Sequence, residues 1–199
     1  NHGYNLHKRV ALSINCFAEI LQDPDDEILF VDYNTPDEHP SLIETIQDTL
    51  TEKARRTVRV IRAYPSLHRH FADKTPFPVV ESIARNIGFR RTNPANKWIL
   101  STNTDMILVP RTPGQSFNDI LKGLKDGFYL LPRFELPEAL WELVDRTKPS
   151  EVIAQVGKWG TDFAINEVIN RPLVRYDAPG DFQLALRRDQ RRIGRCARR

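Results

Sequence analysis

The sequence predicts an α/β protein in which a mostly parallel sheet is flanked by helices. Helical and strand patterns alternate through the first half of the 199-residue chain, and this alternation is typical of parallel strands joined by helices. Polar clusters follow two of the expected strands, at Asp32 and at residues 103–105. Ligands bind at the carboxyl ends of strands in such sheets, so we expect a site there.

The first helix and the first strand have clear patterns. Val10, Ile14 and the apolar residues that follow recur on one helical face, which predicts a helix over residues 7–21. A short apolar run over residues 27–31 predicts a buried strand that ends at Asp32.

A second helix and a second strand are expected next. Leu42 and Ile46 share one face of a helix expected from about residue 40 to 55. Residues 57–61 are β-rich and predict a strand. The three prolines of residues 64–78 predict a loop, and we interpret the His68-Arg69-His70 stretch within it as solvated.

A third helix and a third strand complete this half. Val80 and Ile87 belong to the apolar face of a helix expected over residues 79–91. Residues 98–101 predict the next strand, and residues 106–109 form a further apolar run after the polar cluster.

The second half has a more mixed pattern. It predicts a helix over 116–125, a strand over 128–134, a short helix over 136–145, a helix over 149–170 with a break near 157–160, and a helix from Asp181 to about 192.

Composition and charge exclude several classes of protein. Apolar residues make up 40% of the chain without any run near the ~20 that a membrane span needs. The two cysteines are far apart, which argues against a disulfide framework. No glycosylation sequon or signal-peptide pattern occurs, so we expect a cytoplasmic protein.

The net charge of +3 comes from the tail. Residues 187–199 carry +6, which leaves −3 on the rest of the chain. A basic face that would bind nucleic acid is therefore not expected on the domain, although an arginine tail could contact RNA.

Three common motifs are absent, and an ordered set of weaker ones remains. The chain has no GxxxxGK[ST], no GxGxxG and no HExxH, which argues against P-loop, dinucleotide and zincin chemistry. The remaining motifs are Val31-Asp32-Tyr33-Asn34-Thr35-Pro36-Asp37, then Ala84-Arg85-Asn86-Ile87-Gly88, then Asn103-Thr104-Asp105. In this order they resemble the VDDGSTD, ARNxG and DxD motifs of family 2 glycosyltransferases, over roughly residues 5–110.

The resemblance implies a GT-A-type, Rossmann-like fold and a sugar-nucleotide donor such as a UDP- or GDP-sugar. The nucleotide-binding residues that it implies come from all three motifs and their surroundings: Asp32, Asn34, Asp37, Arg85, Asn86, Arg90 and Asn103. Carboxylates at strand ends can accept from a base N–H, and guanidinium groups match phosphate.

A divalent cation and a catalytic base are also implied by the resemblance. Asp105 would bind Mn²⁺ or Mg²⁺, but Asn103 replaces the first Asp of the DxD motif, which puts metal dependence in question. Asp181 follows Gly180 where inverting members have an acidic pair, and it would deprotonate an acceptor hydroxyl. The acceptor itself, whether carbohydrate, lipid-linked or protein, is not indicated.

This resemblance gives the expected organisation of the chain. Residues 1–110 would bind the nucleotide sugar and residues 111–190 would form the acceptor side. The charge distribution, not the resemblance, predicts that residues 191–199 are a disordered basic tail. A doubly wound sheet begins with a strand, whereas this chain begins with a loop and a helix. Either the chain is a fragment without its first strand, or residues precede Asn1 in the native protein.

Two other functions stay open from the sequence. A sugar-nucleotide pyrophosphorylase has the same broad architecture. A non-catalytic nucleotide-binding module would explain Asn103 and Gly180 as losses of acidic residues.

Overall fold

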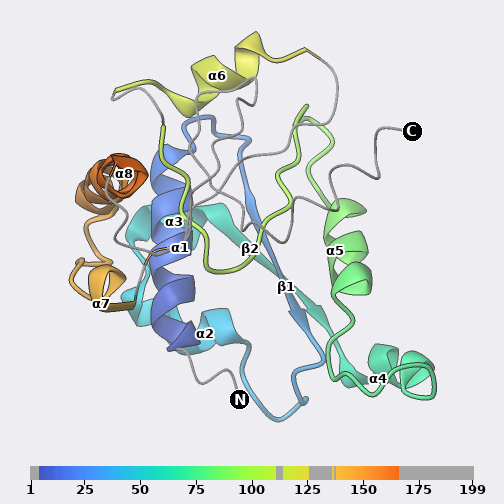
Figure 1. Cartoon of the computed structure of the whole chain (residues 1–199). Helices are drawn as coiled ribbons and strands as arrows, with labels where there is room; N and C mark the ends of the chain where they lie inside the picture. The colour runs from blue at the N-terminus through green and yellow to red at the C-terminus, as the bar shows by residue number, and fades with distance from the viewer. Residues whose placement is uncertain (1–4, 111–113, 126–135, 137, 166–199) are drawn as a thin grey trace. The chain divides into compact units, whose positions relative to one another are not determined.

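The computed structural model describes residues 5–110, 114–125, 136 and 138–165. The chain divides into two compact units, Asn1–Met106 and Ile107–Arg199, and each is described by itself. The first unit mixes helices with a two-stranded parallel sheet, which confirms the α/β class (Figure 1).

The elements of the first unit follow one another closely. They are α1 Leu6–Ile20, β1 Ile28–Tyr33, α2 Leu42–Ile46, the 3₁₀ turn η1 Gln47–Thr49, α3 Glu52–Thr57, β2 Val58–Ala63, α4 Pro65–His68, the 3₁₀ turn η2 Arg69–Phe71 and α5 Glu81–Phe89.

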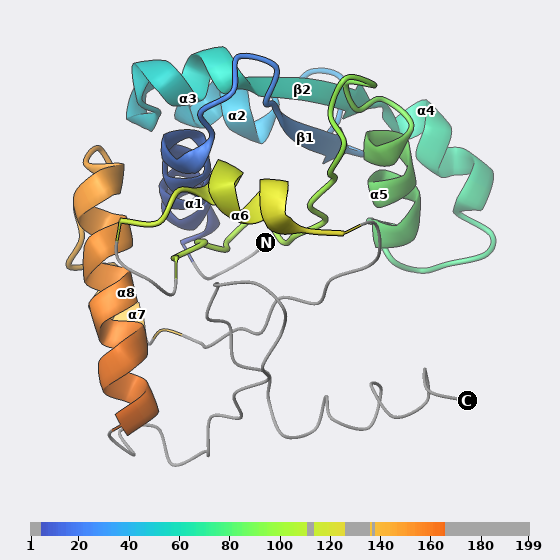
Figure 2. The same ribbon diagram turned by 90° about the horizontal axis from the view of Figure 1, so that it is seen from above.

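The two expected strands pair in parallel along their whole length, from Ile28 opposite Val58 to Tyr33 opposite Ala63. Figure 1 shows α1, α2 and α3 on one side of the strands and α5 on the other, and Figure 2 shows the same arrangement from above. Gly88 of α5 faces β1, where a Cβ at this position would lie 3.4 Å from Cγ2 of Val31, an ordinary van der Waals distance.

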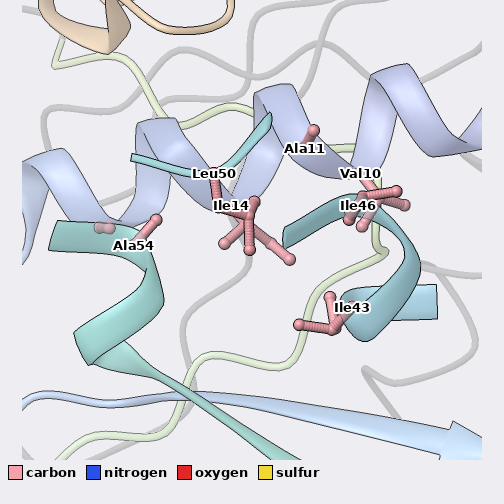
Figure 3. Packing of buried hydrophobic residues seen from close by; sticks show 8 residues of the cluster. Val10, Ala11, Ile14, Ile43, Ile46, Leu50 and Ala54 are labelled. Atoms are coloured by element: carbon pink, nitrogen blue, oxygen red, sulfur yellow. The ribbon is translucent and has the colours of Figure 1, made fainter. Parts of the chain in front are cut away.

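The core of the first unit lies between α1 and the segment that follows β1. Figure 3 shows the buried residues of α1 facing those of α2 and α3. The cluster consists of Val10, Ala11, Ile14, Ala18, Ile43, Ile46, Leu50 and Ala54. The helical periodicity of the sequence predicts most of these positions.

Asn15 and Cys16 are among the buried residues of α1. Asn15 has no exposed surface, donates to the Thr49 carbonyl at 3.0 Å and accepts from the Thr51 N–H at 2.9 Å. Burial, with a smaller contribution from the charge of Glu19, raises the pKa of the Cys16 thiol to about 12. Since the thiolate is the reactive form, Cys16 is not a nucleophile at neutral pH.

The single helix expected over residues 40–55 is wrong, because the chain forms α2, η1 and α3 there. Leu50 adopts an extended backbone and buries its side chain. Thr51 then starts a new helix, since its hydroxyl accepts from the Ala54 N–H at 3.2 Å.

Two further expectations in this unit are corrected. The loop expected over 64–78 contains α4, with Pro65 at its first position, and η2. The strand expected over 98–101 does not form: these described residues have no regular structure. Ile99 and Leu100 are 52% and 42% exposed, so they lack the covering that apolar strand residues require.

The second unit has three helices among its described residues: α6 Phe117–Gly123, α7 Glu138–Trp141 and α8 Pro149–Ile165. The helix expected over 116–125 is confirmed, α7 is shorter than expected, and α8 has no break at 157–160. The segments expected at 128–134 and from Asp181 to 192 lie outside the described residues. No helix in the described ranges has the length and apolar character needed to cross a bilayer.

Candidate functional site

The ends of several elements meet at one edge of the parallel strands. Figure 1 shows α1 and α5 running opposite to β1 and β2, so that the helices begin at the edge where the strands end. Asn34, just beyond β1, donates from Nδ2 to the Pro78 carbonyl at 2.7 Å, which ties the strand end to the segment before α5. Asp32, Asn34 and the turn with Asp37 lie at this edge, where β1 ends.

Asp32 is a buried carboxylate at the end of β1. It is 6% exposed, and Oδ1 accepts from the Thr35 hydroxyl at 2.7 Å. Its Oδ2 lies 3.7 Å from Nε of Arg62, and neither atom has a hydrogen-bond partner in the described part of the chain. Arg62 therefore offsets the charge of Asp32 without using the acceptor capacity of Oδ2, which is costly to leave unfilled.

Arg62 also holds the turn that follows β1. Its Nη2 donates to the Pro36 carbonyl at 2.8 Å and to the His39 carbonyl. Its guanidinium carbon lies 5.6 Å from the centre of the Tyr64 ring, within the range of a cation–π contact. One arginine of β2 thus supports both the carboxylate and the turn.

Asn34 and Asp37 lie in this turn but in different surroundings. Asn34 has a positive φ of 63°, a conformation that Asn tolerates better than most residues. Its backbone N–H donates to the Ala63 carbonyl at 2.8 Å and continues the pairing of the strands. Asp37 is exposed.

His68 contacts the strand end, which corrects its interpretation as part of a solvated loop. It belongs to α4, and its Nδ1 lies 3.1 Å from the Tyr33 hydroxyl, with the two rings edge to face. Burial raises the pKa of Tyr33. The neighbouring Arg69 and His70 are exposed, as expected.

Arg85 joins α5 to the polar cluster at residues 101–103. Nε and Nη2 donate to Glu81 at 2.8 and 2.5 Å. Nη1 donates to the Ser101 hydroxyl at 2.5 Å and the Thr102 carbonyl at 3.2 Å, and Nη2 donates to Oδ1 of Asn103 at 2.8 Å. These five hydrogen bonds match the five N–H donors of a guanidinium, so Arg85 is fully engaged by the protein.

Asp105 is engaged by a second arginine. Its Oδ2 accepts from Nη2 of Arg9, in the first turns of α1, and both side chains are partly exposed. The Ser13 hydroxyl donates to the Met106 carbonyl at 2.6 Å and holds the same segment against α1. The structure thus brings Asp105 to α1 and Asn103 to α5.

The arrangement at Asn103 and Asp105 does not fit a hard divalent cation. Such a cation binds carboxylate and carbonyl oxygens, but an arginine donates to Oδ1 of Asn103 and to Oδ2 of Asp105, so a positive charge already lies beside each of these residues. No three His, Cys, Asp or Glu side chains are grouped to hold a metal anywhere in the described ranges.

The remaining candidates add little to the site. Asn86 and Arg90, on and just after α5, are exposed. Asp181, the expected base, lies outside the described residues.

Two arginines of this edge are missing from the sequence prediction. Arg62 stands opposite Asp32 in the strand register, so a correct pairing of the two strands would have indicated it. Arg9 meets Asp105 across 96 positions of the chain, and no local pattern signals such a contact.

No family model matches the chain, and neither a curated protein nor a solved structure is significantly similar to it.

Proposed function

We propose that this chain is a glycosyltransferase that moves a sugar from a nucleotide-diphosphate sugar to an acceptor hydroxyl. The observation that carries the proposal is the Asp32 carboxylate, which is buried at the carboxyl end of a parallel strand and keeps Oδ2 without a hydrogen bond among the described residues. A base imide N–H is a suitable partner for such an oxygen, and because Oδ2 has almost no exposed surface, the Arg62 side chain or the turn after β1 would have to move aside for the base to reach it.

The same edge favours a donor that carries negative charge. Arg62 and Arg9 bring guanidinium groups close to Asp32 and Asp105, and guanidinium binds phosphate oxygens in two-point contacts. The two parallel strands with helices on either side are compatible with a GT-A-type, Rossmann-like fold, and we propose this fold as the framework for the site.

The reaction proposed is an inverting transfer. The acceptor oxygen attacks the anomeric carbon while the bond from that carbon to the diphosphate oxygen breaks. Asp181 takes the hydroxyl proton as the general base. Donors at the site stabilise the charge that develops on the leaving diphosphate.

Release of free UDP or GDP from a set of UDP- and GDP-hexoses, in the presence of candidate acceptors, tests this proposal. We expect release by the wild-type chain and a loss of about 10²- to 10⁴-fold in Asp181→Asn, the usual effect of removing a general base. UDP affinity should be kept in this variant. Full turnover by Asp181→Asn would eliminate its role as the base.

The same reaction mixtures separate the alternatives. Release of pyrophosphate from a nucleoside triphosphate and a sugar phosphate would indicate a pyrophosphorylase instead. UDP binding without turnover of any donor would indicate a non-catalytic nucleotide-binding module.

A further inference from the structure

Arg9 is a cation with donors to spare at the candidate site. Only its Nη2 is used by a side chain in the described part of the protein, and the partner is Asp105. A guanidinium has five N–H donors in a fixed plane, so the remaining donors of Arg9 can bind a further anion. The Arg9 side chain is 32% exposed, which makes these donors accessible.

Arg85 differs from Arg9 because the protein uses all of its donors. It cannot bind a phosphate without first giving up one of its contacts to Glu81 or to residues 101–103. Arg85 is therefore a positioning residue, which acts through the segment that it holds.

The contact with Arg85 fixes the orientation of the Asn103 amide. A guanidinium has donors only, so the atom of Asn103 that faces it must be the carbonyl oxygen. The amide NH₂ of Asn103 is then the group left to meet a ligand. A donor at this position suits a phosphate or ribose oxygen and does not suit a cation.

We propose that Arg9, held by Asp105, provides the positive charge for the diphosphate, so that the nucleotide binds without a divalent cation. This inference rests on the proposed sugar-nucleotide function. It assigns to Arg9 the place that the resemblance gives to a metal ion, and it explains why the oxygens of both Asn103 and Asp105 accept from arginines.

Calorimetric titration of UDP, in EDTA and in Mn²⁺, into the whole chain and its variants tests the inference. The wild-type Kd should differ by less than about twofold between the two buffers. In EDTA, Arg9→Met should weaken UDP binding by about 10- to 100-fold, the effect of losing a charged hydrogen bond. Arg9→Lys should restore part of the affinity, because it keeps the charge.

Two controls separate a lost phosphate contact from a general disturbance of the fold. The affinity for uridine, measured by NMR, should be unchanged in Arg9→Met, since uridine lacks the diphosphate. Arg56→Met removes a guanidinium that pairs with Glu52 on the exposed surface of α3, and it should bind UDP like the wild type.

UDP binding that requires Mn²⁺, or that survives in Arg9→Met in EDTA, would overturn this inference and leave the proposed function intact. Equal losses of uridine and UDP affinity in Arg9→Met would also overturn it, because they would show a structural role for Arg9. Absence of UDP binding by the wild type in both buffers would contradict the proposed function, and the inference would fall with it.

Discussion

Glu27 lies just before β1 and Asp32 lies near its end. Each of the two carboxylates pairs with an arginine of β2. Glu27 pairs with Arg59 at 2.9 Å and Asp32 with Arg62 at 3.7 Å. The two arginines are three residues apart, so the two pairs act at opposite ends of the same short ladder. A slip of one residue in the register would break both pairs, which makes them a constraint on strand alignment.

The Glu27 pair gives a testable dependence of stability on pH. Burial acts to raise the pKa of the Glu27 carboxyl. Three interactions act in the opposite direction: the hydrogen bond from Arg59, the hydrogen bond from the Asn93 N–H, and the positive charge of Arg59. Together they outweigh burial, so the pKa of Glu27 lies below its usual value. A lowered pKa stabilises the fold at pH values above the pKa of the unfolded chain. This stabilisation is lost as the pH falls through the lowered pKa.

We expect Glu27→Gln to reduce the free energy of unfolding by about 1 kcal/mol at pH 7. The difference from the wild type should shrink as the pH is lowered. Urea unfolding of both proteins at a series of pH values measures this difference. A difference that stays constant down to acid pH would show that the charge of Glu27 contributes nothing.

At the scale of the element, amphipathic periodicity and β-rich runs predicted α1, β1, β2 and α5 well. The break between α2 and α3 was missed because the apolar spacing continues through Leu50. The new helix starts because the Thr51 hydroxyl accepts from the Ala54 N–H. This cap does not alter the apolar spacing, so the spacing alone does not reveal the break. Propensity favours a strand at residues 98–101, but a strand also needs a neighbour that covers and pairs with it.

The candidate site was predictable only in part, because local patterns do not show which distant segments pack together. Strand ends could be located from local patterns, so Asp32 and the polar cluster at 103–105 were found. Which arginine meets which acid depends on packing between distant segments. The contact between Arg9 and Asp105, and the use of every Arg85 donor within the protein, follow from tertiary structure alone.

The hydrogen bonds of Asn15 connect α1 to the start of α3, and a single substitution can test them. Its amide joins α1 to the backbone at Thr49 and Thr51, where α3 begins. Asn15→Ala would remove the partner of the part-buried Thr51 N–H and of the part-buried Thr49 carbonyl, so we expect a loss of about 2–4 kcal/mol in unfolding free energy. Chemical denaturation followed by circular dichroism measures this loss.

Asn86→Ala, on the exposed surface of α5, is the matched control. It should change the unfolding free energy by no more than about 0.5 kcal/mol. Equal effects of the two substitutions would mean that the Asn15 hydrogen bonds do not hold α1 to α3.

At the scale of the whole molecule, the proposed donor site belongs to the unit Asn1–Met106. Every described candidate residue lies in this unit, from Asp32 to Asp105, together with Arg9 and Arg62. The net positive charge of the chain comes from residues 187–199, and the remaining residues together carry −3. We therefore claim that nucleotide binding at this edge depends on the local groups, above all on Asp32.

The affinity for UDP of the wild type and of Asp32→Asn, measured by calorimetry in EDTA, tests this claim most directly. We expect binding by the wild type and a loss of about tenfold or more in Asp32→Asn, where a charged acceptor becomes neutral. Asp48→Asn removes an exposed carboxylate from η1 and should bind UDP normally. Equal affinity in all three proteins, or no binding by the wild type to either UDP or GDP, would contradict it.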